Sequence, residues 1–334
     1  KVVPWNDMRN RWVRCASERN KSEDVKRYFN TFAAHHRGYT FILAKKFNDL
    51  YGVCITYEQC REIKYDLEME FGLAGCLDEA NSQEVSRNNC TERSFRDTQE
   101  FREFREHTLS SMNRSVIKKK HEEAKQHYMK VTDVFTTSRS RAFQILCFDI
   151  EVYEHNHDIM LEIGYVICRF SWRRGHAKPN ATLVTKRHLI IQDNLRYKNG
   201  DKVPDNRYGF LFGSSETLSM RNAVTRFRND VRECDYILGH SVKHDDAYLR
   251  NIGVDLRQLG KLMFDTQVVK TYEESLKESE KYFMRSLSHL LKEYQVNYQE
   301  SHLHNAGCDA FYTMMVFLRQ MGYSTSEVNV IMLA

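Results

Sequence analysis

Phe-Gln-Ile-Leu-Cys-Phe-Asp-Ile-Glu-Val, residues 143–152, is an apolar run interrupted by two carboxylates, Asp149 and Glu151. An acidic side chain inside a hydrophobic strand is costly unless it is paired or binds a cation. Because side chains alternate between the two faces of a strand, Asp149 and Glu151 share one face and Ile150 points into the core. Two carboxylates on one face offer hard oxygen ligands to a Mg²⁺ or Mn²⁺ ion.

Two further acidic motifs follow along the chain. Asp245 ends the run Ile-Leu-Gly-His-Ser-Val-Lys-His-Asp, which contains His240. Asp246 follows directly, so an assignment shifted by one position would make Asp246 the ligand in place of Asp245. His304 precedes Asp309 by one helical turn in the last helical pattern. Each motif is weak by itself, because an Asp-x-Glu pair is usually a solvated strand edge and a histidine at a helix start is more often structural. Their order and expected placement together favour one common site.

The chemistry that fits such a set is phosphodiester hydrolysis with two metal ions. Two cations about 3.5–4 Å apart can activate a water molecule and stabilise the leaving oxygen of an in-line displacement. This reaction needs roughly four carboxylates and a general base with a pKa near neutrality, which a histidine supplies.

The texture of the chain changes at residue 142, which divides the predicted domains into 1–141 and 142–334. Apolar runs predict strands, and amphipathic patterns predict helices between and after them. We expect an α/β fold with a mixed five-stranded sheet flanked by helices. The predicted strands are Gln144–Val152, Leu161–Phe170, Leu183–Ile191, Tyr236–Gly239 and Lys261–Phe264, and the predicted helices are Glu216–Val231, Asp246–Ile252, Phe283–Glu293 and Asn305–Met321.

Residues 1–141 are predicted to be mostly helical. Aromatic and apolar residues recur there at helical steps, including Trp5, Trp12, Tyr28, Phe32 and Phe41–Leu43. A polar loop is expected at 78–93, a charged helix at 98–132 and a linker at 136–140. The polar insertion 194–212 is either a flap over the site or a plain surface loop.

Composition narrows the class of protein. A hydrophobic content of 41% with 12% aromatic residues is typical of a folded chain. The absence of a long apolar stretch argues against membrane insertion, and nine cysteines without a Cys-x-x-Cys pair favour reduced thiols. We therefore expect an intracellular protein, in the cytoplasm, the nucleus or an organelle matrix. Residues 1–142 hold 26 of the 50 Lys and Arg residues and 21 of the 45 Asp and Glu residues, so they carry an excess of positive charge. This excess either adds affinity for a nucleic-acid backbone or is simply a solvated helix face.

The three acidic motifs resemble those of the DEDDh exonucleases, the histidine-containing branch of the DnaQ-like superfamily with a ribonuclease H-like fold. Asp149 and Glu151 match the first motif, residues 239–245 resemble the second, and His304 with Asp309 resembles the third. The likeness spans residues 143–321. Outside these motifs, Leu-Glu-Ile-Gly-Tyr-Val at 161–166 resembles the strand after the first motif, and Asp265-Thr266 resembles a structural strand end.

Within the superfamily, the first motif, the Glu-Ile-Gly strand and Gly-Phe-Leu-Phe-Gly at 209–213 are similar to a mainly fungal branch. That branch includes a factor linked to messenger-RNA export through a DEAD-box helicase. A DEDDh enzyme that works beside an Argonaute in RNA silencing is the alternative within the family.

The resemblance implies roles for the matching residues. Asp149, Glu151 and Asp309 would hold one metal ion, Asp149 would bridge to a second, and Asp245 would bind the second through water. His304 would deprotonate the attacking water. The small Thr-Thr-Gly often found after the first motif is here Val152-Tyr153-Glu154, a bulkier sequence where the terminal sugar docks. The candidate substrate contacts are Val152, Tyr153, which can stack a base or merely pack, and His240.

The favoured function is a 3′–5′ exonuclease that uses Mg²⁺ or Mn²⁺, two ions per site, and releases nucleoside 5′-monophosphates from single-stranded RNA or, alternatively, DNA ends. A second hypothesis is a catalytically weak or inactive nuclease-fold module that binds nucleic acid or a protein partner in RNA metabolism. Region 1–141 would then be the working part, and it is the expected surface for a protein partner in either case. An endonuclease of the same fold is a third, weaker hypothesis.

Overall fold

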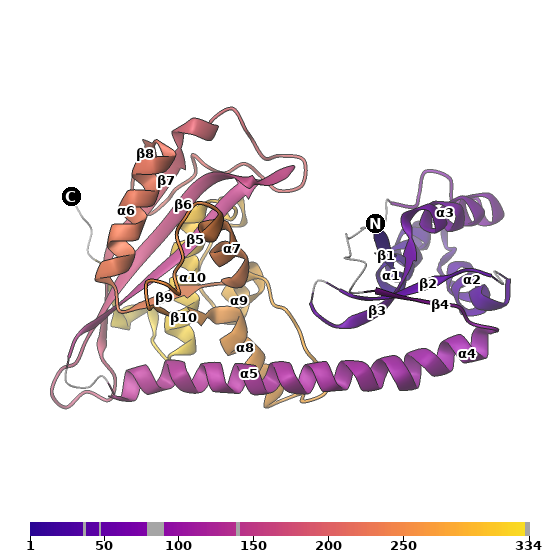
Figure 1. Ribbon diagram of the computed structural model, residues 1–334, viewed down its shortest axis with the longest axis horizontal. Coiled ribbons are helices and arrows are strands. Elements are labelled where there is room, and N and C mark those ends of the chain that lie inside the picture. Colours follow the sequence, from indigo (N-terminus) through magenta and orange to yellow (C-terminus); the bar gives the residue numbers. More distant parts are fainter. Residues whose placement is uncertain (36–37, 47, 79–89, 138–140, 331–334) are drawn as a thin grey trace. The chain divides into compact units, whose positions relative to one another are not determined.

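The chain divides between Lys120 and His121 into two compact units (Figure 1). The computed structural model describes residues 1–35, 38–46, 48–78, 90–137 and 141–330. The second unit contains all three acidic motifs.

The second unit is built on a mixed sheet. The strands are β5 (Phe143–Tyr153), β6 (Asn156–Ser171), β7 (Asn180–Ile191), β8 (Ser215–Leu218), β9 (Tyr236–Gly239), β10 (Leu262–Asp265) and β11 (Val328–Val330). Their order is β10-β9-β5-β6-β7-β11, with β8 also paired to β7. β5, β6 and β7 form an antiparallel meander, whereas β9 runs parallel to β5 and β10 parallel to β9. This mixed topology is that of a ribonuclease H-like fold.

Helices cover both faces of this sheet (Figure 1). Side chains of β5 alternate between the two faces of the sheet. On one face, Leu146, Phe148 and Ile150 pack with α6 (Met220–Glu233) and α7 (Lys243–Asn251). On the other face, Phe143, Ile145 and Cys147 pack with α8 (Thr266–Ser275), α10 (Ala306–Gln320) and the end of α5 (Ser110–Thr137). The helix α9 (Leu287–Glu293) packs beside α10.

The sequence predicted five of these strands, and the number was too small. The structure adds β8 and β11, which are four and three residues long and both pair with β7. The predicted helix at Glu216–Val231 begins only at Met220, because its first residues form β8. The helix α8 was not predicted. Strands as short as β8 and β11 contain too few residues for an alternating pattern to be recognised, and these residues form strands because they pair with β7.

The first unit is mostly helical, as predicted for region 1–141, but it also contains strands that the sequence did not predict. It contains a four-stranded antiparallel sheet in the order β1-β3-β2-β4. Phe41–Leu43, expected at helical steps, lie instead in β2 and pair with β3 and β4. The elements are β1 (Val2–Pro4), α1 (Trp5–Cys15), α2 (Ser22–His35), β2 (Phe41–Lys45), β3 (Tyr51–Thr56), α3 (Tyr57–Phe71), β4 (Cys90–Arg93) and α4 (Thr98–Glu103).

Aromatic packing holds the first unit together. Trp5 contacts the rings of Phe29, Phe32, Phe41 and Phe101 at centroid distances of 4.6–5.8 Å, which joins α1, α2, β2 and α4 in one core. Most of the expected loop at 78–93 lies outside the described residues, and its last four residues form β4.

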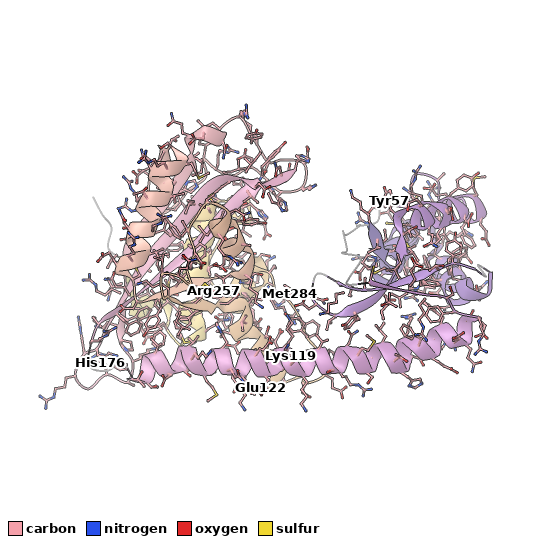
Figure 2. All side chains as sticks on the ribbon, viewed as in Figure 1. Tyr57, Lys119, Glu122, His176, Arg257 and Met284 are labelled. Atoms are coloured by element: carbon pink, nitrogen blue, oxygen red, sulfur yellow. The ribbon has the colours of Figure 1, made fainter. Side chains whose placement is uncertain are left out.

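The helix α5 belongs to both units. It continues α4 through a π-helical turn, η3 (Phe104–Leu109), and runs to Thr137, so the predicted charged helix is present and longer than expected. Val131 and Val134 pack against the sheet of the second unit, whereas Glu122 is exposed (Figure 2). The division between the two units therefore falls within α5, between Lys120 and His121, and not at residue 142. Residues 138–140 of the expected linker lie outside the described part of the chain.

Two further observations concern the whole chain. No helix in the described residues is long and apolar enough to cross a membrane. All nine cysteines lie in described segments and are free thiols.

Candidate active site

The first pair of carboxylates lies on the face of β5 that α10 covers. In the register with β6, Asp149 is opposite Gly164 and Glu151 is opposite Glu162. Directly opposite residues of an antiparallel pair share a face. The acidic face of β5 therefore continues across the hairpin, and Glu162 is almost fully buried there.

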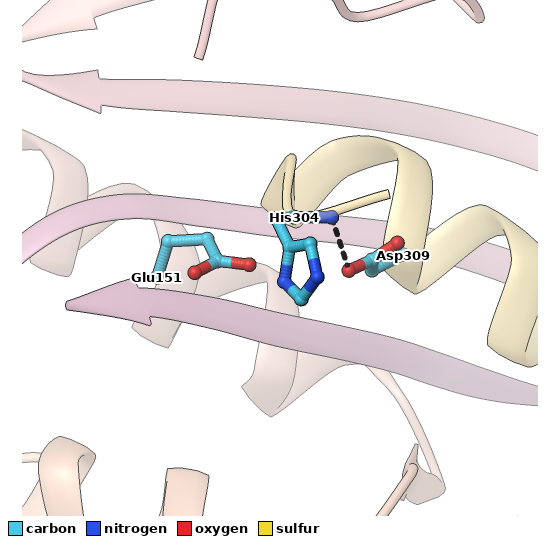
Figure 3. Close-up of side chains that lie close together, drawn as sticks. All are labelled: Glu151, His304 and Asp309. Carbon is cyan, nitrogen blue, oxygen red and sulfur yellow. Dashed lines mark hydrogen bonds between the residues drawn. The ribbon is translucent and has the colours of Figure 1, made fainter. Parts of the chain in front are cut away.

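The second group comes from the turn that begins α10. Asn305 caps this helix by accepting a hydrogen bond from the amide of Cys308, and the His304 amide donates to Asp309 Oδ2 at 3.0 Å. His304 has a φ of +61°, a left-handed conformation that is uncommon for a residue with a side chain. Figure 3 shows the His304 ring between Glu151 and Asp309, and one ligand atom from each of the three lies within 4.8 Å of the others.

A close approach of two backbones brings α10 to this position. A Cβ added at Gly164 would lie 2.0 Å from the carbonyl carbon and oxygen of Ala306, so only glycine fits beneath the start of α10. The next residue of the helix is also confined, though by side chains, because a Cβ at Gly307 would meet the Phe210 ring at 2.7 Å and His188 Cβ at 2.8 Å. These two glycines set the height of His304 and Asp309 above the sheet.

Asp245 reaches the site from the first turn of α7. The carboxylate of Asp265, at the end of β10, accepts hydrogen bonds from the amides of Ser241 and Val242 at 3.0 and 2.9 Å, which fixes the turn between β9 and α7. The negative charge of Asp245 raises the pKa of both Asp149 and Glu151. Asp246 instead forms an ion pair with Arg250 at 3.4 Å.

Burial and mutual repulsion make these carboxylates weak acids. Burial, followed by the negative charge of Asp245, raises the pKa of Asp149 well above its usual range, and burial with Asp309 does the same to the pKa of Glu151. Burial raises the pKa of Asp309 to about 8. Like charges gathered out of water favour protonation or a cation among them.

The residues fit a divalent cation. Asp309 Oδ1 is buried and accepts no hydrogen bond from any described residue, although buried carboxylate oxygens are normally satisfied. The four carboxylates supply the hard oxygen ligands that Mg²⁺ and Mn²⁺ prefer. Asp149, Glu151, Asp245 and Asp309 are the residues that would hold the ions.

The family of this domain follows from its sequence as well as its geometry. Residues 144–320 match the DEDDh family model described as DNA polymerase III subunit epsilon-like, C-terminal domain, and this segment is more than half of the 334 residues. The chain belongs to this DEDDh family. The DEDDh domain so defined lies within the second unit and contains every motif residue predicted from the sequence.

Several fungal proteins are similar to the chain. Good for full DBP5 activity protein 2 of Saccharomyces cerevisiae is 27% identical over 199 residues, which are 52% of this chain and 34% of that protein. An uncharacterized protein of the same yeast is 25% identical over 223 residues, 60% of this chain and 44% of that protein. The chain thus spans less than half the length of these two relatives. An uncharacterized nucleolar protein of Schizosaccharomyces pombe is 28% identical over 179 residues, 53% of this chain and 68% of that protein. The predicted resemblance to a mainly fungal DEDDh branch is confirmed.

The three predicted substrate contacts have different surroundings. Val152 is partly buried against the core on the α6 face. The ring of Tyr153 lies 5.2 Å from those of both Tyr197 and His155. His240 Nδ1 is 2.8 Å from the hydroxyl oxygen of Thr266. Their contact with substrate stays a prediction.

A buried pair beneath the DEDDh site was not recognised from the sequence. Glu162 accepts a hydrogen bond from the Ala306 amide at 3.1 Å and lies 2.7 Å from His188 Nε2. His188 Nδ1 is in turn 2.8 Å from the Ser215 hydroxyl. The hairpin register, which places Glu162 opposite Glu151, is the signal that could have predicted this support.

Glu162→Gln is expected to destabilise the DEDDh domain by about 1–2 kcal/mol, because the charge-assisted bonds to His188 and the start of α10 are lost. The melting temperature should fall by about 2–6 °C. Glu233→Gln, on an exposed part of α6, is the matched control and should change the melting temperature little. Equal melting temperatures for the two variants would contradict a structural role of Glu162.

Glu154 holds the polar insertion against the end of β5. Its carboxylate accepts hydrogen bonds from four consecutive backbone amides, Gly200 to Val203, at 2.7–3.1 Å. These bonds hold the pKa of Glu154 at about 2 despite its burial. Further along the insertion, Asn206 accepts a hydrogen bond at its carbonyl from the side chain of Asn305, which caps α10. The insertion is therefore tied to both ends of the site rather than being a plain surface loop.

Glu154→Gln is expected to increase hydrogen exchange at the amides of residues 200–203 by on the order of tenfold, because a neutral acceptor replaces a charged one. Asp201→Asn is the control, since the Asp201 carboxylate bonds His155 and not these amides. Exchange mass spectrometry of the peptide containing residues 200–203 measures the effect. Unchanged protection in Glu154→Gln would show that other contacts hold the insertion.

Proposed function

We propose that the chain is a metal-dependent 3′–5′ exonuclease acting on single-stranded nucleic-acid ends, with RNA as the favoured substrate. The observation that carries this proposal is the grouping of Glu151 from β5 with His304 and Asp309 at the start of α10, whose ligand atoms lie within 4.8 Å of one another. Asp149 shares the face of β5 with Glu151, and the negative charge of Asp245 acts on both. All five residues of the DEDDh set are present. The membership of the DEDDh family supports a nuclease.

The carboxylates would divide the work of holding two Mg²⁺ or Mn²⁺ ions. Asp149, Glu151 and Asp309 would hold the first, and Asp149 would be shared with the second, beside Asp245. Bound there, the ions would lower the pKa of a water molecule and neutralise charge on the scissile phosphate. The buried, unsatisfied oxygen of Asp309 and the mutual repulsion of the acids support this assignment.

His304 is proposed as the general base. Partial burial lowers the pKa of its imidazole, so that the ring is neutral near pH 7 and able to accept a proton from water. The side chain remains exposed to solvent on one side, which leaves room for water and substrate. The hydrogen bond from its own amide to Asp309 ties the base to a proposed metal ligand.

The test uses single-stranded RNA and its DNA counterpart, each labelled at the 5′ end and incubated with the full chain and Mn²⁺. We expect a ladder that shortens from the 3′ end, faster on RNA, with nucleoside 5′-monophosphates as the product. His304→Ala should slow the reaction by about 10²–10⁴-fold, the usual contribution of a general base.

The controls separate the remaining hypotheses. Asp149→Ala/Glu151→Ala must abolish the ladder, which excludes a contaminating nuclease. Internal fragments instead of a ladder would favour the endonuclease hypothesis. If RNA and DNA both stay intact with Mg²⁺ as well as with Mn²⁺, the proposal is overturned in favour of a module that binds nucleic acid or a protein.

A further inference from the structure

A polar pocket of about 530 Å³ lies within the first unit, where three helices meet. Arg9 reaches it from α1, Asn30 from α2, and Arg102 and Arg105 from α4 and the π-helical turn η3. Asn6, Glu106, Leu109, Ser110 and Asn113 complete the lining. The three arginines face a single acidic lining residue, Glu106, so the pocket has a net positive charge.

The π-helical turn gives the pocket its shape. The segment Phe104–Leu109 interrupts the helix between α4 and α5, and the Ser110 hydroxyl donates to the carbonyl of Arg105 at 3.1 Å, which satisfies an acceptor in the wide turn. Single π-helical turns inside α-helices are frequent at functional sites. Here the turn contributes Arg105, Glu106 and Leu109 to the lining.

The arginines are held close together without a carboxylate partner. Arg105 donates to the side-chain oxygen of Asn6 at 3.0 Å, and Arg9 donates to the side-chain oxygen of its neighbour Asn10 at 3.3 Å. Among the described residues, neither Arg9 nor Arg102 nor Arg105 forms an ion pair with an acidic side chain. Burial, followed by the positive charge of Arg9, lowers the pKa of Arg105, as expected for two guanidinium groups that share one space.

We propose that this pocket binds phosphate groups of a single-stranded nucleic acid, apart from the DEDDh site. Guanidinium groups match phosphate oxygens through paired N–H donors, and an anion among them would relieve their repulsion. The volume exceeds that of one phosphate and accommodates a nucleotide. The lining contains no aromatic ring on which a base would stack. The contacts are therefore to phosphate and sugar, and the affinity they add is independent of base sequence.

The test measures binding of a fluorescein-labelled single-stranded RNA to the full chain by anisotropy, in EDTA to prevent cleavage and over a series of KCl concentrations. Arg9→Gln/Arg102→Gln should weaken binding about tenfold and reduce the slope of log affinity against log salt by about 1.4, since two phosphate contacts are lost. The loss should be the same for RNAs of unrelated sequence.

The matched control is Arg14→Gln/Arg61→Gln, which removes the same charge from exposed positions of α1 and α3 outside the pocket. Equal affinities and slopes for the two double variants would overturn the proposal.

Arg105→Lys, which keeps the charge but not the planar fork, should weaken binding with an unchanged melting temperature. If a nucleoside 5′-monophosphate or inorganic phosphate protects the wild-type chain against thermal unfolding while RNA affinity is the same in both double variants, the occupant is a small phosphate and not a nucleic acid. Because binding is read without divalent metal, its failure is distinct from a failure of the exonuclease assay.

Discussion

Asp149→Asn is expected to lower exonuclease activity about a thousandfold and, in the absence of metal, to raise the melting temperature. The loss of activity follows from removing the carboxylate proposed to be shared by both ions, at a cost of about 4 kcal/mol in the barrier. The gain in stability follows from removing a buried charge that repels Asp245, Asp309 and Glu151. A gain of about 1 kcal/mol corresponds to about 2–4 °C.

The same repulsion predicts an unusual pH dependence. In the folded protein the pKa of Asp309 is raised to about 8, whereas an unfolded aspartate has a pKa of about 3.9. Between these values the folded state holds a proton that the unfolded state has released. The contribution of Asp309 to the stability of the metal-free protein is therefore fully present below about pH 4 and is lost as pH rises towards 8.

Differential scanning fluorimetry with and without Mn²⁺ measures both effects. We expect Mn²⁺ to raise the melting temperature of the wild-type chain most at pH 8, where the carboxylates are most charged, and to change that of Asp149→Asn much less. Asp133→Asn, an exposed position of α5, is the control. A melting temperature that ignores both metal and Asp149→Asn would argue against an assembled site.

Gly164→Ala is expected to be the most damaging single methyl group in the DEDDh domain. The added Cβ would lie 2.0 Å from backbone atoms of Ala306 and 2.2 Å from the Gly307 nitrogen, and backbone cannot move aside as a flexible side chain can. We expect a loss of about 3 kcal/mol in the free energy of unfolding. The protein that does fold should lose about a hundredfold in activity, because His304 and Asp309 move with the start of α10.

Gly52→Ala is the matched control, a strand glycine in β3 whose added Cβ would meet only the flexible side chain of Lys46, at 3.0 Å. Chemical denaturation compares the two variants. If Gly164→Ala unfolds at the same denaturant concentration as the wild type and keeps its activity, then α10 can slide on β6, and the position of His304 is not fixed by this contact.

The sequence was sufficient for the features that depend on local pattern. The alternation of apolar residues around Asp149 and Glu151 predicted β5 and its acidic face, and the Tyr236–Gly239 strand was predicted at its observed bounds. The order of the three motifs indicated the DEDDh family. In the structure their acidic residues lie on β5, α7 and α10, a strand and two helices as predicted.

What the sequence did not provide depends on contacts between distant segments. Phe41–Leu43 have apolar side chains compatible with helix or strand, and pairing with β3 and β4 selects the strand. The confinement of Gly164 depends on Ala306, which is far away in the chain. Burial of the Glu162–His188 pair likewise requires the start of α10 above it. The polar lining of the arginine pocket comes from three helices whose meeting no periodicity reveals.

Because α5 belongs to both units, it limits how the DEDDh domain can be moved between proteins. A gene break at residue 142 would remove Val131 and Val134 from the sheet, and would deprive the Asp265 amide of its acceptor, His127 Nε2, at 3.0 Å. Asp265 is the residue that fixes the turn carrying Asp245. A transplantable DEDDh unit therefore has to bring the second half of this helix as its own first element, and any recombination that respects the fold must cut upstream of it.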